Sequence, residues 1–106
     1  MWKARIVAPK TARKGEVVEI KAMISHPMET GYRHDAMGKI VERDIIKRMT
    51  VNYAGAEVFA MECYTGVAAN PFVSFTTVAT ETSDLVFTWT DEKGAAVSET
   101  VHLVVT

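Results

Sequence analysis

The chain has 106 residues, 48% of them hydrophobic, and a formal net charge of −1 at neutral pH. This length predicts a single domain over residues 1–106, and the hydrophobic fraction excludes a disordered chain. Acidic and basic residues are interspersed, so the sequence offers no basic surface for nucleic acid.

Three absences narrow the class of protein further. Cys63 is the only cysteine, so no internal disulfide can form. The first ten residues, MWKARIVAPK, lack the apolar stretch of a secretory signal. No apolar run approaches the roughly 20 residues of a membrane-spanning helix. Taken alone, these features favour the cytoplasm.

Apolar and polar residues alternate along most of the chain, as they do in strands with one side on a core. The alternation is clearest in residues 18–24, 85–89 and 101–105. The residues at 16–24 also fit helical spacing, but their β-branched content favours a strand. We predict strands near residues 3–8, 16–25, 44–53, 56–62, 71–80, 84–91 and 96–105.

Turn-forming residues separate these strands. Lys14-Gly15 precedes the second, Ala54-Gly55 joins the third to the fourth, and residues 91–94 predict a tight hairpin with Gly94 at positive φ. Short strands with turns at regular intervals predict an all-β, immunoglobulin-like β-sandwich of about seven antiparallel strands. Trp89 is expected in its core.

The connection over residues 26–43 is much longer than the roughly 4–6 residues usual in compact domains, which suggests a functional loop. It begins with SHPMETGYR, residues 25–33. Pro27 should stiffen its entry, and Gly31 permits a sharp reversal. Met37-Gly38 predicts a small hairpin between residues 32–34 and 39–41.

Several side chains in this loop could bind a metal. His26, Glu29, His34 and Asp35 lie within ten residues, and His102 and Cys63 lie elsewhere. No CxxC, HxH or HExxH spacing is present, so we interpret the histidines as loop residues with solvent or backbone partners. We assign no metal ligand and no cofactor.

Catalytic residues are also unsupported. Cys63 has no neighbouring cation in sequence to activate it, so it is interpreted as a small, partly buried apolar residue rather than a nucleophile. No glycines of a nucleophile elbow surround a serine, and no glycine-rich phosphate loop exists. The sequence therefore predicts a protein that is not an enzyme.

Four segments together resemble the SoxZ family, over about residues 4–103. Residues 26–31, His-Pro-Met-Glu-Thr-Gly, are the most specific part, and the segments are PKTARKGEVVEIKAMISHPMETGYR, RDIIKRMTVNYAGAEVF, AANPFVSF and DLVFTWTDEKG. The resemblance implies an immunoglobulin-like fold. The chain departs from the family around residues 63–67, where Cys-Tyr-Thr stands in place of a sequence like Leu-His-Pro.

The resemblance also implies a function. SoxZ is the non-catalytic half of the SoxYZ sulfur-carrier complex of bacterial thiosulfate oxidation. Its SoxY partner carries the substrate on a cysteine in a C-terminal glycine-rich arm, and other Sox enzymes act on that arm. This chain has no such tail, so it should pair with a SoxY-type subunit and help present the arm. The family works in the periplasm and is exported with the signal-bearing partner. The resemblance therefore implies the periplasm in place of the cytoplasm.

On this basis we expect the start of the long connection to contact the partner, its arm or an incoming enzyme. The expected partner-binding residues are His26, Pro27, Met28, Glu29, Thr30, Gly31, Arg33, Asn70 and Phe72. Met23, Val86 and Val104 point outward in the alternation and are candidates for buried partner surface.

Two other classes remain open. One is an iron-binding redox protein similar to superoxide reductase, an immunoglobulin-like family that also has a His-Pro pair after a strand. That site uses four histidines and a cysteine, whereas this chain has three histidines. The other is a stand-alone adhesion or chaperone-type module.

Overall fold

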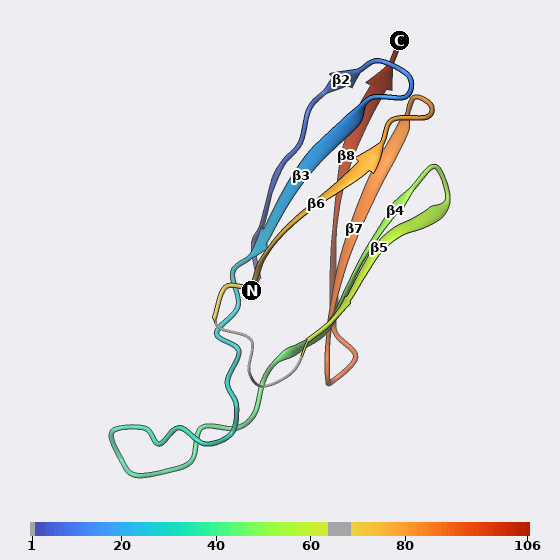
Figure 1. The fold of residues 1–106 in the computed structure, drawn as a ribbon. Helices are drawn as coiled ribbons and strands as arrows, with labels where there is room; N and C mark the ends of the chain where they lie inside the picture. Colours follow the sequence, from blue (N-terminus) through green and yellow to red (C-terminus); the bar gives the residue numbers. More distant parts are fainter. Residues whose placement is uncertain (1, 64–68) are drawn as a thin grey trace.

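The computed structural model describes residues 2–63 and 69–106 and folds them into two β-sheets (Figure 1). The strands are β1 (Ala4–Val7), β2 (Thr11–Ala12), β3 (Val17–Ile24), β4 (Ile46–Tyr53), β5 (Ala56–Glu62), β6 (Phe72–Val78), β7 (Ser83–Asp91) and β8 (Ala96–Val105). The predicted all-β sandwich is confirmed, and each of the seven predicted strands is present within about two residues. None of the described residues belongs to a helix that could cross a membrane.

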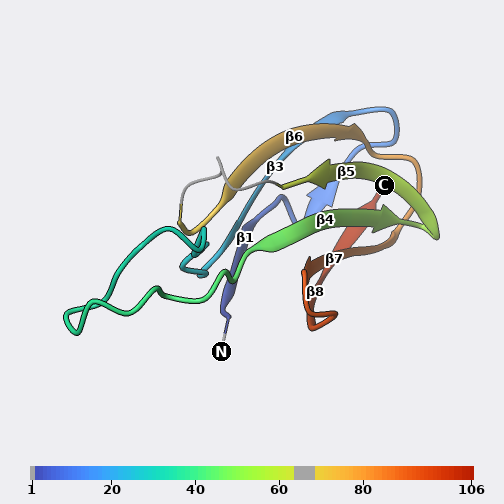
Figure 2. The same cartoon turned by 90° about the horizontal axis from the view of Figure 1, so that it is seen from below.

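The eighth strand, β2, corrects the prediction. It has two residues and pairs in parallel with β8, so the pairing is not antiparallel throughout. A strand of two residues is too short to show an alternation in sequence. The smaller sheet has the order β1-β3-β6, and the larger has the order β2-β8-β7-β4-β5. Figure 2 shows the two sheets as separate layers.

The core lies between the sheets and follows the period-two pattern. In β3, Val18, Ile20, Ala22 and Ile24 are all buried, and in β7 the buried positions are Leu85, Phe87 and Trp89. Burying each large side chain contributes about 1.5–3 kcal/mol. Trp89 is 2% exposed, which confirms its predicted place in the core.

Two of the predicted turns are present. Ala54 and Gly55 both have positive φ, 53° and 81°, as a two-residue hairpin turn between β4 and β5 requires. Gly94 has φ 91° in the turn between β7 and β8. Tyr53 is the last residue of β4, directly before the first of these turns. Its hydroxyl accepts hydrogen bonds from the backbone N–H groups of Thr80 and Glu81, at 3.2 and 3.0 Å. This contact fixes the β6–β7 connection against β4.

Candidate functional site: the projecting loop

Residues 25–45, between β3 and β4, leave the sandwich and return to it, and we call them the projecting loop (Figure 1). With this loop the molecule is 57 Å long and only about 21 Å across. The loop extends beyond the ends of both sheets in both ribbon views. It is therefore accessible to another molecule along most of its length.

The outer part of the loop is the small hairpin that the sequence predicts. Val41 N–H donates to the Arg33 carbonyl at 2.7 Å, and Asp35 N–H donates to the Lys39 carbonyl at 2.8 Å. Asp35 also accepts a bond from the backbone N–H of Met37 at 2.8 Å. Gly38, at φ 78°, makes the turn. The hairpin is thus defined by its own hydrogen bonds.

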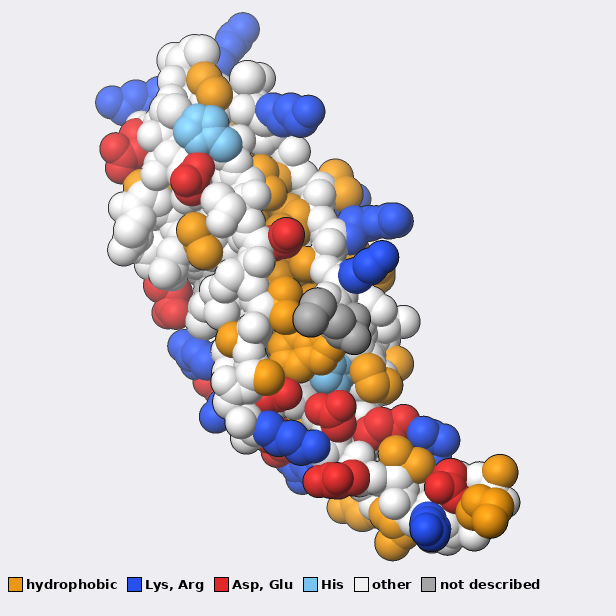
Figure 3. All heavy atoms as spheres, turned by 180° about the vertical axis from the view of Figure 1, so that it is seen from behind, with side chains coloured by type: hydrophobic (Ala, Val, Ile, Leu, Met, Phe, Trp, Pro, Cys, Tyr) orange, Lys and Arg blue, Asp and Glu red, His pale blue; other side chains and the backbone are white. Residues whose placement is uncertain are grey.

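The end of the hairpin exposes apolar side chains. Tyr32 is 81% exposed, Met37 84% and Ile40 64%. Figure 3 shows apolar side chains at the far end of the molecule, mixed with acidic and basic ones. Exposed apolar side chains grouped on a projecting element are a common feature of protein-interaction sites.

The base of the loop is organised by His26, which is 1% exposed. Its ring packs edge-on against the ring of Trp2, with 5.0 Å between the ring centroids. Its Nδ1 atom accepts a hydrogen bond from the backbone N–H of Met28 at 3.0 Å. In the neutral imidazole this places the proton on Nε2, which lies 3.6 Å from Oδ1 of Asp44.

Asn70 ties the loop base to the start of β6. The side-chain Oδ1 of Asn70 accepts a hydrogen bond from the backbone N–H of His26 at 2.9 Å, and the backbone N–H of Asn70 donates to the His26 carbonyl at 2.7 Å. Asn70 adopts φ 54°, in the left-handed region that asparagine tolerates better than most residues. This reciprocal pair fixes two segments that are far apart in sequence.

Met28 is the second buried residue of the base. It is 4% exposed and has φ 53°, which is unusual for a residue other than glycine. Its Sδ atom accepts a hydrogen bond from the backbone N–H of Ile46 at 3.3 Å. The side chain therefore belongs to the core, where it holds a strained backbone in place.

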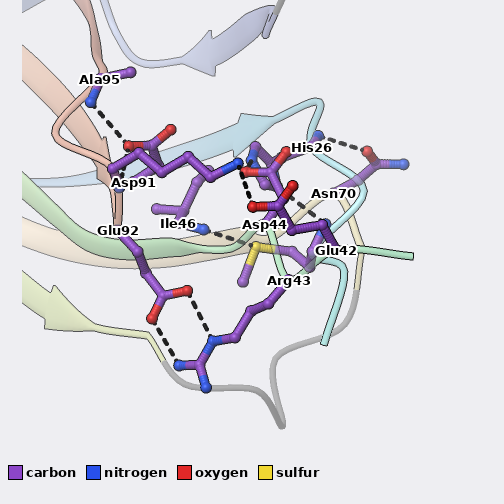
Figure 4. Close-up of polar contacts among 11 residues, drawn as sticks. His26, Glu42, Arg43, Asp44, Ile46, Asn70, Asp91, Glu92 and Ala95 are labelled. Atoms are coloured by element: carbon purple, nitrogen blue, oxygen red, sulfur yellow. Dashed lines mark hydrogen bonds and ion pairs between the residues drawn. The ribbon is translucent and has the colours of Figure 1, made fainter. Parts of the chain in front are cut away.

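The returning limb of the loop is bound to the turn between β7 and β8 (Figure 4). Arg43 makes two bonds to the carboxylate of Glu92, at 2.8 and 2.7 Å. The backbone N–H of Glu92 donates to the Ile45 carbonyl at 3.2 Å. The two limbs are joined to each other by reciprocal backbone bonds between Glu29 and Asp44, both at 2.8 Å. The base is thus a rigid support for the hairpin.

On the outgoing limb, Glu29 and Arg33 form an ion pair. The guanidinium of Arg33 donates to both carboxylate oxygens of Glu29, at 2.7 to 3.2 Å. These hydrogen bonds lower the pKa of Glu29, and the same contact raises the pKa of Arg33. Both groups are therefore charged at neutral pH.

The structure separates the predicted partner-binding residues into three groups. Partner contact by His26, Met28 and Asn70 stays a prediction; Asn70 is bonded to His26, and the side chains of His26 and Met28 are buried. The cause is the packing of His26 on Trp2 and of Met28 in the core. The residues accessible on the loop are Pro27, Glu29, Thr30, Gly31 and Arg33. Phe72 lies elsewhere, on the outer side of β6, and is 60% exposed.

Residues that the sequence reasoning missed are Trp2, Arg43, Asp44 and Glu92. Their contribution depends on contacts between distant segments, and Arg43 and Glu92 are 49 residues apart. A signal was nevertheless present, because Glu42-Arg43-Asp44 is a dense charged run directly before an apolar strand.

Cys63 is buried, 4% exposed, and its backbone N–H donates to the Lys47 carbonyl at 2.7 Å. Burial raises the pKa of its thiol, and the nearby carboxylate of Glu62 raises it further. The interpretation of Cys63 as an apolar residue is confirmed. Residues 64–67, where the chain departs from the SoxZ pattern, lie outside the described residues.

The three histidines of this chain do not form the iron site that the superoxide reductase alternative requires. His34 lies in the exposed hairpin, and His102 pairs with Asp84 at 2.8 Å on the larger sheet. The Nε2 atom of His26 lies 3.6 Å from Oδ1 of Asp44. Within residues 2–63 and 69–106, no three His, Cys, Asp or Glu side chains are grouped to hold a metal ion.

Several solved structures share this fold. A superoxide reductase (neelaredoxin) from Ignicoccus hospitalis superposes with a TM-score of 0.73 at 14% identity, covering 97% of this chain and 79% of that one. A putative superoxide reductase from Thermotoga maritima gives 0.75 at 16% identity, covering 97% and 85%. The sulfur carrier protein SoxY from Chlorobium limicola gives 0.67 at 16% identity, covering 97% and 78%. At these identities the likeness shows the fold alone.

The sequence itself identifies the family. No curated protein matches the chain. The family model described as sulphur oxidation protein SoxZ matches residues 5–102, which is nearly the whole chain. The chain therefore belongs to the SoxZ family of sulphur oxidation proteins.

Proposed function

We propose that this chain is the non-catalytic subunit of a SoxYZ-type sulfur-carrier complex. In this proposal it binds a SoxY-type subunit, whose C-terminal cysteine arm carries the sulfur substrate, and presents that arm to the Sox enzymes. The observation that carries the proposal is the SoxZ family match over residues 5–102.

The state of Cys63 supports this division of labour. A carrier thiol must be accessible and must form a thiolate, because the thiolate is the nucleophile. The thiol of Cys63 is buried, and its raised pKa keeps it protonated at neutral pH. The substrate-bearing thiol is accordingly assigned to the partner subunit.

The projecting loop supports a role in recognition. Its base is held by the Arg43–Glu92 ion pair and by the reciprocal bonds of Asn70, so the hairpin is presented on a fixed support. The accessible limb carries Glu29 and Arg33, and the hairpin end exposes the apolar side chains of Tyr32, Met37 and Ile40. In our proposal this loop contacts the carrier arm or an incoming enzyme, while His26 and Met28 set its direction.

The test is co-expression with the SoxY-type subunit, followed by mass measurement of the purified assembly. We expect a stable one-to-one pair and no turnover of thiosulfate by this chain alone. A chain that stays unpaired contradicts the proposal and favours a stand-alone module. Stoichiometric iron in the purified chain, or sulfur chemistry without the partner, favours a redox enzyme.

The role of the loop has its own test. Arg33→Ala should leave the pair intact and reduce thiosulfate-dependent turnover by the reconstituted Sox enzymes about tenfold, because one charge-assisted contact contributes about that factor. Arg13→Ala, an exposed arginine far from the loop, is the matched control. Equal turnover by both variants contradicts a recognition role for Arg33.

We further propose that the pair works in the periplasm, exported with a signal-bearing partner. Fractionation of cells that express the chain with and without the SoxY-type subunit tests this. Periplasmic location only in the presence of the partner is the expected result. Cytoplasmic retention of the pair contradicts it.

A further inference from the structure

The outer faces of the two sheets differ in character. On the larger sheet, the outward positions of β7 and β8 carry mainly polar side chains, and Thr88 pairs with Ser98 at 3.1 Å between their hydroxyl oxygens. The Asp84–His102 pair lies on the same face. Such a surface is well hydrated and needs no cover. Val86, Ala96 and Val104 are apolar residues among these polar groups, and Val104 is 38% exposed.

The outer face of the smaller sheet is apolar by comparison. Because the buried residues of β3 alternate with outward ones, the strand register places the outward residues in rows across β1, β3 and β6. Met23 stands between Arg5 and Phe72, and Lys21 between Val7 and Ser74. The exposed fractions are 62% for Val7, 63% for Val17, 60% for Phe72 and 46% for Val78.

This face, which we call the β1–β3–β6 face, contains a hollow of about 230 Å³. It is lined by Arg5, Val7, Lys21, Ala22, Met23 and Phe72. An aromatic side chain, Phe72, and three smaller apolar ones thus lie beside two cations. Apolar surface surrounded by charge is the usual composition of an interface centre and its rim.

The charges on this face identify the kind of partner. Lys21 pairs with Glu19 at 3.4 Å. Arg5 forms no ion pair with any residue in the described ranges, 2–63 and 69–106. A second copy of this chain would bring two more cations to the interface and only an acid that is already paired. The complementary surface is therefore an apolar patch that carries a carboxylate.

We propose that the β1–β3–β6 face is the docking surface for the SoxY-type subunit, an inference that rests on the proposed function. Phe72, Met23 and Val7 meet an apolar patch of that subunit, and Arg5 receives one of its carboxylates. The projecting loop and the larger sheet stay free. The pair can then expose the loop to the enzymes that act on the carrier arm.

The experiment measures the dissociation constant of the purified pair for matched variants. Phe72→Glu should weaken binding at least about 30-fold, as substitutions at interface centres do. Arg5→Gln should weaken it about tenfold. Thr100→Glu introduces the same negative charge at an exposed position on the outer face of β8 and should change binding less than about twofold. Circular dichroism confirms that each variant folds.

Salt dependence gives a second readout. Raising the ionic strength should weaken the wild-type pair more than the Arg5→Gln pair, because screening acts on the proposed ion pair. If the wild-type pair forms and Phe72→Glu and Arg5→Gln bind as tightly as wild type, the docking surface is wrong while the proposed function stands. If the wild-type subunits do not associate, the proposed function fails first. Self-association that Phe72→Glu abolishes assigns the face to a second copy instead.

Discussion

Nδ1 of His26 accepts a hydrogen bond from the backbone N–H of Met28, so a buried ring fixes the backbone where the projecting loop begins. Met28 has φ 53°, a conformation that costs on the order of 1–3 kcal/mol outside glycine. The cost is offset because the Met28 side chain is buried and its Sδ contacts Ile46 N–H. These two residues together set the direction in which the loop leaves the sandwich.

Replacing His26 tests this arrangement. His26→Ala removes both the ring packed on Trp2 and the acceptor for Met28 N–H, and we expect it to lower the free energy of unfolding by about 2–4 kcal/mol. His26→Phe keeps most of the bulk and loses the Nδ1 acceptor together with Nε2, which lies 3.6 Å from Asp44 but forms no hydrogen bond with the described residues, so a loss of about 1–3 kcal/mol should remain. Urea unfolding measures both. A Phe variant as stable as wild type contradicts a structural role for the hydrogen bond.

Two glycines of the loop allow a matched comparison. Gly31 and Gly38 both have positive φ, 89° and 78°. A Cβ at Gly31 would lie 3.3 Å from the Cβ of Arg43, whereas one at Gly38 meets no described atom within 4 Å. Gly38→Ala should therefore cost only the backbone strain, about 1–2 kcal/mol.

Gly31→Ala should cost more, because Arg43 has to shift and its bonds to Glu92 weaken. Amide hydrogen exchange of the Glu29 and Asp44 backbone N–H groups reports this local effect. We expect faster exchange in Gly31→Ala and unchanged exchange in Gly38→Ala. The same exchange rates in both variants would show that the close approach to Arg43 has no consequence.

Tyr53 offers a test of the sandwich itself. Its hydroxyl accepts bonds from two backbone N–H groups, those of Thr80 and Glu81. Tyr53→Phe leaves both donors without this acceptor, and we expect a loss of about 1–3 kcal/mol in urea unfolding. Tyr32→Phe removes the hydroxyl of a residue that is 81% exposed and should change stability by less than about 0.5 kcal/mol. A neutral Tyr53→Phe would exclude this contact as a source of stability.

The sequence predicts the fold well because the relevant signal is local. Alternation in β3 and β7 shows directly which side chains face the core, and Met37-Gly38 specifies a turn through the chemistry of two adjacent residues. The loop base is different. Whether His26 is exposed depends on Trp2, and whether Arg43 is free depends on Glu92. A charged run before a strand has the same sequence pattern whether its arginine is paired or free, so the Arg43–Glu92 pair could not be derived. The burial of His26 could not be derived either, because it depends on a contact with a residue 24 positions away in the sequence, Trp2.

The pKa of Cys63 leads to a prediction about reactivity. Burial raises the thiol pKa, so alkylation by iodoacetamide at neutral pH should be at least about tenfold slower in the folded chain than in urea. A raised folded pKa stabilises the fold below the ordinary thiol pKa, and that contribution is lost as pH rises through the folded value. Stability should fall at alkaline pH in wild type and fall less in Cys63→Ala. Equal alkylation rates in both states would contradict a buried thiol.

The Glu29–Arg33 pair predicts the behaviour of the loop in acid. Hydrogen bonds from Arg33 lower the pKa of Glu29. A lowered folded pKa stabilises the paired state above the ordinary glutamate pKa, and that contribution is lost as pH falls through the lower folded value. The loop should therefore be unaffected near neutral pH and loosen only in acid. NMR titration of the Glu29 side-chain carboxyl carbon follows the change directly.

In Arg33→Gln this carbon should titrate in the ordinary glutamate range, because the charged donor is gone. Arg33→Lys keeps the charge but loses the bidentate geometry of the guanidinium. The titration midpoint of Glu29 in this variant should therefore lie between those in wild type and in Arg33→Gln. Both groups are on the surface, so the effect on global stability should be small even where the midpoint shift is clear. A Glu29 midpoint that is the same in wild type and Arg33→Gln would mean that the pair does not persist in solution.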